Sequence, residues 1–200
     1  MGDFEVGRIV PSTRDLFGAV NTGRRGLALL PLIEEDAHAA DEVARLAALD
    51  VRGFAVERPG PLSLTVATST TTTPLLCLER MATVEACQRG RFFGADGLAL
   101  RAGSVLRPTV QSMRMMALTS VSPEEAAAAV ADGARGLLVV GSREAVLALD
   151  VPRPTLVIAR VEEIDADGLR ELAGAVDAAV VPAAVHRAPR FSDLLEELDS

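Results

Sequence analysis

The stretch 93–101, FGADGLALR, decides the fold, because its pattern returns three more times along the chain. It recurs as LDVRGFAVE at 49–57, DGARGLLVV at 132–140 and AVDAAVVPA at 175–183. Each copy is a small-residue turn followed by a short apolar run, with Gly53, Gly97, Gly136 and Ala178 at equivalent positions. Their separations of 44, 39 and 42 residues are too long for one β/α unit and suit two. Four double units predict eight strands.

The intervening strands are expected at four further apolar runs, 27–33, 74–78, 115–119 and 154–159. Near-continuous apolar runs are typical of parallel strands that helices cover on both faces. The repeats supply the even strands, expected near 53–57, 97–101, 136–140 and 178–181. An open doubly wound sheet would also alternate strands and helices, but no G-x-G-x-x-G follows the first strand. The fourfold repeat therefore predicts an α/β fold, a small single-domain (β/α)8 TIM barrel over residues 26–200.

Helix signals fall between these strands. The clearest is Ser122-Pro123-Glu124-Glu125, with an N-cap, a proline in the first turn and a capping-box glutamate. Amphipathic segments are expected at about 36–49, 83–92, 165–174 and 192–198. Residues 62–73 have weak helix propensity, so a short or irregular helix is expected there. Residues 1–25 form an apolar amino-terminal segment, helical at 13–20, which is expected to cap the barrel bottom or to contact a partner subunit.

Composition excludes several classes of function. The net charge of −8 and pI near 4.8 argue against nucleic acid as a partner. No apolar run is long enough to cross a bilayer and no cleavable leader is evident, so a cytoplasmic protein without a membrane partner is expected. Cys77 and Cys87 are too few for a disulfide framework and are expected to be reduced packing residues. No metal site and no cofactor is predicted.

The chain contains no lysine, so all 20 of its basic residues are arginine. Schiff-base chemistry on a lysine is therefore excluded. Arginine stays protonated, with a pKa above about 12, and can bind anions but is a poor general acid or base near neutral pH. His38, on a predicted helix, and His186, near Arg187, belong to no nucleophile or metal pattern and are expected at the surface.

Four stretches, GLALLPLI at 26–33, TPLLCLERM at 73–81, GADGLAL at 94–100 and AVDAAVVPAAVHRAP at 175–189, match motifs of one enzyme family. From Leu16 onward the chain resembles indole-3-glycerol phosphate synthase, a barrel enzyme of tryptophan biosynthesis that closes an indole ring with loss of carbon dioxide and water. The resemblance covers about nine tenths of the chain. It implies a phosphate-binding barrel with lyase-type chemistry.

The positions that this family uses for catalysis are replaced. The first-strand glutamate falls on Leu32 and the lysine two residues later on Glu34. The third-strand lysine, the implied general acid, falls on Leu78, and the fifth-strand glutamate, the implied general base, on Thr119. The sixth-strand asparagine falls on Val140 or Gly141. The resemblance thus leaves no proton donor and acceptor pair.

The implied phosphate site is altered as well. In such barrels the phosphate sits on backbone N–H groups of the loops after strands seven and eight. Glu162 places a negative charge there, and Pro182 has no N–H to donate. Arg160 could compensate if it reaches inward, with Glu162 and Glu79 as its nearest expected acidic partners. No phosphate or sulfate is expected at the usual site.

Polar residues at or just after the strand ends are candidates for an anion-binding mouth, since barrel enzymes place their chemistry at this face. The alternative is that these acidic and basic groups pair and merely close the barrel top. The candidates are Glu57, Arg58, Glu79, Arg80, Arg101, Thr119, Ser142, Arg143 and Arg160.

Three functions remain open. The first is a non-catalytic relative of the synthase, a pseudoenzyme kept for protein interaction, scaffolding or regulation, with a protein partner or a homo-oligomer. The second is an enzyme of changed chemistry on an anionic substrate, a phosphate or a carboxylate. The third is a small-molecule binder without turnover. The sequence favours the first, because acid, base and phosphate positions are all replaced while the barrel pattern persists.

The purified protein should have no indole-3-glycerol phosphate synthase activity, because the positions of the implied general acid and base hold Leu78 and Thr119. A fluorescence assay for the indole product at saturating substrate checks this. Restoring both groups with Leu78→Lys and Thr119→Glu should still give little turnover, since the phosphate loops stay altered. Turnover above that of a mock purification would contradict the prediction.

Overall fold

The computed structural model describes residues 9–34, 37–60, 67 and 70–198. Its eight strands are all parallel and close in the order β1 to β8, with β8 pairing back to β1. This closed barrel confirms the predicted fold class. The strands are β1 Ala28–Ile33, β2 Phe54–Val56, β3 Leu75–Met81, β4 Gly97–Arg101, β5 Met116–Val121, β6 Gly136–Gly141, β7 Leu156–Val161 and β8 Ala178–Val181.

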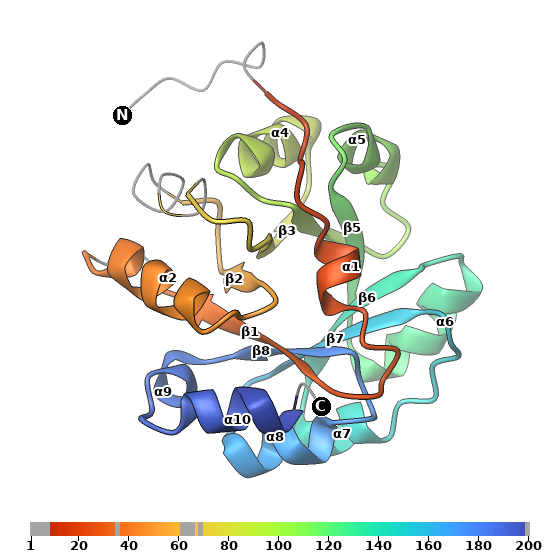
Figure 1. Cartoon of the computed structure of the whole chain (residues 1–200). Helices are drawn as coiled ribbons and strands as arrows, with labels where there is room; N and C mark the ends of the chain where they lie inside the picture. Colours follow the sequence, from red (N-terminus) through yellow and green to blue (C-terminus); the bar gives the residue numbers. More distant parts are fainter. Residues whose placement is uncertain (1–8, 35–36, 61–66, 68–69, 199–200) are drawn as a thin grey trace.

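Helices follow the strands and lie around the barrel (Figure 1). The expected box at Ser122 and Glu125 is present, although the first turn is a 3-10 helix. The sequence predicts no residue ranges for the short helices α5, α7 and α9, and most of the segment 62–73 lies outside the described residues. The elements are α1 Leu16–Val20, α2 Ala39–Ala48, α4 Val84–Phe92, α5 Arg107–Ser112, η2 Pro123–Glu125, α6 Ala126–Ala131, α7 Arg143–Leu147, α8 Ala166–Leu172, α9 Ala183–His186 and α10 Phe191–Leu198.

Strand side chains alternate between two apolar clusters, because successive residues of a strand point to opposite faces. On β5, for example, Leu118 lies in the cluster that fills the barrel, while Ala117 and Val121 lie in the cluster between the strands and the helices. Both faces of the sheet are therefore buried, which explains the near-continuous apolar strands.

The helix α1 closes the amino-terminal end of the barrel. Its Leu16 and Val20 are almost fully buried in the interior cluster, and the segment crosses the middle of the barrel in Figure 1. A Cβ added at Gly97 would overlap Leu16, so the glycine in this repeat makes room for the helix. The helix begins at Leu16 and not at Thr13 because Asp15 is its N-cap, accepting from the N–H of Gly18.

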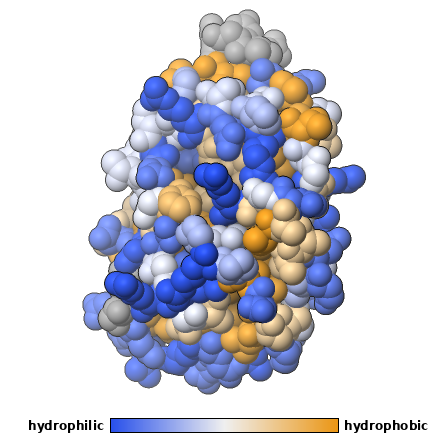
Figure 2. All heavy atoms as spheres, turned by 90° about the vertical axis from the view of Figure 1, so that its right-hand side faces the viewer, coloured by the Kyte–Doolittle hydropathy of each residue, from blue (hydrophilic) through white to orange (hydrophobic). Residues whose placement is uncertain are grey.

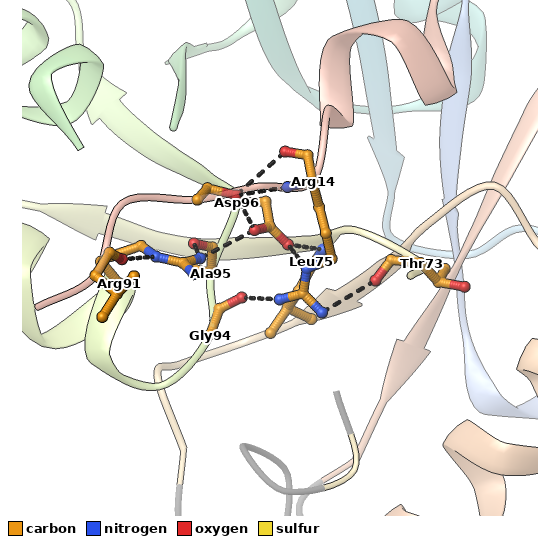
Figure 3. A network of polar contacts seen from close by, with 9 residues as sticks. Arg14, Thr73, Leu75, Arg91, Gly94, Ala95 and Asp96 are labelled. Atoms are coloured by element: carbon orange, nitrogen blue, oxygen red, sulfur yellow. Dashed lines mark hydrogen bonds and ion pairs between the residues drawn. The ribbon is translucent and has the colours of Figure 1, made fainter. Parts of the chain in front are cut away.

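The buried carboxylate of Asp96, just before β4, fixes the first half of the amino-terminal segment (Figure 3). It accepts hydrogen bonds from the Ser12 hydroxyl and from the N–H of Leu75, the latter at 2.8 Å. Arg14 Nε lies 2.8 Å and Arg91 Nη1 3.0 Å from its oxygens. Two guanidinium groups thus offset the cost of burying one carboxylate.

Asp177 plays the matching part just before β8. Its carboxylate accepts from the N–H of Val157 at 2.9 Å and from the N–H of Arg24 at 3.2 Å. The Arg24 guanidinium also donates to the carbonyl oxygen of Val151 at 3.0 Å, and its Nε lies 3.8 Å from Asp177. The amino-terminal segment is therefore attached before β4 and before β8, on either side of α1.

Replacing Asp96 by alanine should lower the free energy of unfolding by about 3–5 kcal/mol, because it leaves two largely buried guanidinium groups without their anion. Urea denaturation followed by circular dichroism measures this change. Glu85→Ala, which removes an exposed carboxylate on the neighbouring helix α4, should change stability by less than about 0.5 kcal/mol. A loss below about 1 kcal/mol for Asp96→Ala would contradict the assigned role.

Candidate functional site

The carboxyl-terminal end of the barrel is here called the mouth. At this end, the alternation along each strand decides which side chains point inward. Because Ala99, Leu118 and Ile158 lie in the interior cluster, residues two positions later on the same strands face the same way. The register supports this, since Arg101 pairs with Ser120 and Arg160 with Val140. The inward positions at the mouth are Leu32, Glu57, Leu78, Arg80, Arg101, Ser120, Val140, Arg160 and Pro182.

Three arginines share this inward face. Arg80 on β3 pairs in register with the inward Ala99 after a register shift that begins at Cys77. Arg101 ends β4, and both side chains are exposed. Within the described part of the chain, neither Arg80 nor Arg101 makes an ion pair or a side-chain hydrogen bond. Two exposed guanidinium groups thus lie on neighbouring strands at this end of the barrel.

The third arginine is held by a carboxylate. Arg160 Nη2 donates to Glu57 Oε1 at 2.5 Å, and the two side chains are 34% and 51% exposed. The strands β7 and β2 that carry them are separated in the barrel by β8 and β1. The pair thus spans the mouth, and Glu57 replaces both Glu162 and Glu79 as the partner expected for Arg160.

Thr119, expected at the mouth, lies elsewhere. It alternates with the inward Leu118, is only 2% exposed and accepts a hydrogen bond from Arg107 Nη2 at 2.8 Å. Its hydroxyl faces the layer between the barrel and the helices, and Ser120 takes the inward position. A glutamate introduced at 119 would therefore not point into the mouth. Arg107, on α5, was missed because this helix was not expected.

The remaining sequence candidates lie around the rim. Arg58 follows Glu57 and is exposed, and Glu79 is exposed between the inward Leu78 and Arg80. Ser142 caps α7 by accepting from the N–H of Ala145 at 3.3 Å. The structure therefore brings Glu57 and Arg160 into contact but places these three residues outside that pair.

Arg143, the first residue of α7, also lies on the rim. Its guanidinium lies 3.3 Å from Glu171 and 3.6 Å from Glu144, so it links α7 to α8. These contacts to two exposed carboxylates satisfy Arg143 locally. It is thus less available to an anion than Arg80 or Arg101.

A groove of about 740 Å³ lies among the loops after β6, β7 and β8, where related barrels hold phosphate. Four carboxylates line it, against the single arginine Arg143, which is already paired. Its lining also includes Pro182, which has no N–H to donate. This lining opposes a phosphate group. The acidic residues are Glu144, Glu162, Glu163 and Asp165.

His186 is a correction to the sequence analysis, since it is buried and not at the surface. Its Nε2 lies 3.0 Å from the carbonyl oxygen of Leu32, and its Nδ1 lies 3.6 Å from Glu42 without a hydrogen bond. Arg187 binds Glu42 through two nitrogens, at 2.7 and 3.0 Å. Burial lowers the pKa of His186, whereas the hydrogen bond from Arg187 lowers the pKa of Glu42. This cluster joins α2 to α9 behind the end of β1.

The described residues hold neither a cluster of metal ligands nor a membrane-spanning helix. No group of three or more histidine, cysteine, aspartate or glutamate side chains there converges as metal ligands would. No helix in that part of the chain is both long and apolar enough to cross a membrane.

Comparison with known proteins extends the fold assignment. No protein-family model and no curated protein matches the sequence. Among solved structures, orotidine 5'-phosphate decarboxylase from Pyrococcus horikoshii OT3 superposes with a TM-score of 0.68 at 11% identity, covering 86% of this chain and 97% of the other. Thiamine phosphate pyrophosphorylase from Pyrococcus furiosus gives 0.58 at 18% identity, covering 89% and 98%. The fold is a TIM barrel.

A third neighbour comes from the tryptophan pathway. Tryptophan synthase subunit alpha from Legionella pneumophila str. Paris gives a TM-score of 0.59 at 14% identity, covering 84% of this chain and 85% of the other. At such identities the likeness establishes the barrel alone. These comparisons support the barrel fold that the sequence resemblance implied, but they do not show the indole-3-glycerol phosphate synthase family itself.

Acidification should destabilise the protein through His186. Because its folded-state pKa is lowered, the unfolded chain binds more protons, so stability is full above the unfolded value of about 6.5 and falls as pH drops below it. Thermal unfolding between about pH 7 and pH 5.5 measures this slope. His186→Gln should flatten it, because the buried imidazole is removed. An equal slope in wild type and His186→Gln would contradict the assignment.

Proposed function

We propose that this chain is a non-catalytic TIM barrel that binds a small organic anion at its mouth and acts as a binding or regulatory module. The observation that carries the proposal is the inward set Arg80, Arg101 and Arg160, which faces a single carboxylate, Glu57, among the described inward positions. At the described inward positions there are thus three positive charges and one negative charge, in a protein whose net charge is −8. A local excess of this sign attracts anions.

The lack of turnover follows from the same residues. Proton transfer needs a donor and an acceptor placed on either side of a substrate. At the described inward positions the ionisable groups are three guanidiniums, which stay protonated, and Glu57, which is bound to Arg160. The positions of the implied acid and base hold the apolar Leu78 and the outward Thr119. Among the described inward positions there is thus no second group for acid–base chemistry, whereas the arginines can orient and neutralise an anion.

The surface favours a small ligand over a broad apolar partner. The exposed large apolar side chains of the described residues are spread along the sequence, in the amino-terminal segment, in α4 and α7, and in the loop before α5. On the face shown in Figure 2, hydrophilic side chains predominate and apolar ones form only small areas between them. Protein interfaces typically need a contiguous, closely packed core. The apolar residues are Val10, Phe17, Val84, Val105 and Leu147.

Two solved neighbours are named for phosphate-bearing compounds, which fits an anionic ligand at the same end of the barrel. This chain, however, lines the corresponding groove with carboxylates, so its anion should bind at the arginines and not between the last two loops. Leu32, Leu78 and Val140, also inward, add apolar surface beside the arginines. A carboxylate on an apolar body matches this combination better than inorganic phosphate does.

Isothermal titration calorimetry with benzoate, citrate and inorganic phosphate tests the proposal, with benzamide as a neutral analogue. Benzoate or citrate should bind, and benzamide and phosphate should not. The double variant Arg80→Gln/Arg101→Gln should weaken binding by about tenfold or more, since each charge-assisted hydrogen bond is worth about 1.5–3 kcal/mol. Affinity should also fall as salt is raised.

Arg190→Gln is the matched control, because its side chain is 90% exposed outside the mouth and the charge change per residue is the same. It should leave the affinity within about twofold of wild type. The proposal fails if no carboxylate binds, or if the control weakens binding as much as the double variant does.

A further inference from the structure

We propose that the Glu57 side chain acts as an internal competitor at the mouth, so that the ligand is a carboxylate that displaces Glu57 from Arg160. This inference rests on the proposed function and specifies its ligand class and its control. Arg160 already binds one carboxylate, at 2.5 Å, and so displays the chemistry that the site accepts. A carboxylate from solution would make the same kind of contact.

The geometry of the pair leaves room for exchange. A single nitrogen of Arg160 contacts a single oxygen of Glu57, whereas a guanidinium carries five N–H donors and can grip a carboxylate at two points. A ligand that binds with both oxygens would therefore use donors that Glu57 leaves unused. Once released, Arg160 would complete a set of three arginines with Arg80 and Arg101.

The environment of Glu57 makes its release inexpensive. Its side chain is half exposed, so water can solvate the carboxylate as soon as it leaves Arg160. An exposed ion pair is worth at most about 1 kcal/mol, so pairing with Glu57 lowers the fraction of unpaired Arg160 by about fivefold or less. By contrast, Asp96 is fully buried among four donors and cannot exchange in this way. The Arg160–Glu57 pair is thus within reach of water, whereas the contacts of Asp96 are not.

The pair also crosses the mouth, because β2 and β7 are separated by β1 and β8. Ligand binding would therefore also change the contacts between strands. It would remove a link between two non-adjacent strands and free the Glu57 carboxylate, giving the ligand-bound mouth a different charge pattern at its rim. That change is a signal that a regulatory module can present without any turnover.

The experiment measures benzoate affinity by calorimetry in variants that separate competition from simple charge. Glu57→Gln removes the competitor and one negative charge, and should raise the affinity about fivefold. Glu57→Asp keeps the charge but shortens the side chain, and should also raise the affinity. Glu79→Gln removes an exposed charge on β3 without touching Arg160, and should change the affinity by less than about twofold.

A double-mutant cycle completes the test. In an Arg160→Gln background, Glu57→Gln should no longer raise the affinity, because there is no guanidinium left to release. Equal gains for Glu57→Gln and Glu79→Gln, with no gain for Glu57→Asp, would overturn the inference while leaving the anion site in place. If neither wild type nor Glu57→Gln binds benzoate or citrate, the proposed function fails together with the inference.

Discussion

The structure depends on two buried carboxylates that stand one residue before a barrel strand. Asp96 and Asp177 occupy the same position of the sequence repeat, and each accepts a hydrogen bond from a backbone N–H of the preceding strand, at Leu75 and Val157. Each also binds an arginine of the amino-terminal segment, Arg14 for Asp96 and Arg24 for Asp177. A charge buried this deeply costs several kcal/mol unless all its donors are in place. The two carboxylates therefore fix strand register and the closing segment together.

The same position shows why the chain relies on arginine. Arg14 binds Asp96 and also donates to the carbonyl oxygens of Gly94 and Thr73, at 2.6 and 3.3 Å. A planar guanidinium reaches three acceptors in different directions, which a lysine ammonium on a flexible stem does with less order. The other two repeat copies carry Arg52 and Arg135 where these have aspartate, so the four double units alternate in charge as well as in apolar pattern.

What the sequence could predict follows from the range of the interactions. Eight strands and the longer helices were found because repeats, apolar runs and capping residues act within a few positions of the chain. The helices α5, α7 and α9 have six, five and four residues, too few for a helical period to show. The contacts of Arg160 with Glu57, of Arg107 with Thr119 and of His186 with Leu32 join distant segments, so no local pattern indicates them.

The arginines at the two ends of the barrel differ in burial and in bonding. At the amino-terminal end, Arg14 and Arg24 are largely buried and bonded to several groups at once, as residues that hold a fold together are. At the mouth, Arg80 and Arg101 are exposed on neighbouring strands, with no ion-pair partner among the described residues. Exposed charges at the end of a barrel where ligands commonly bind are the observation behind the proposed anion site. We therefore propose that the arginines of the mouth serve an anion, whereas Arg14 and Arg24 serve the fold.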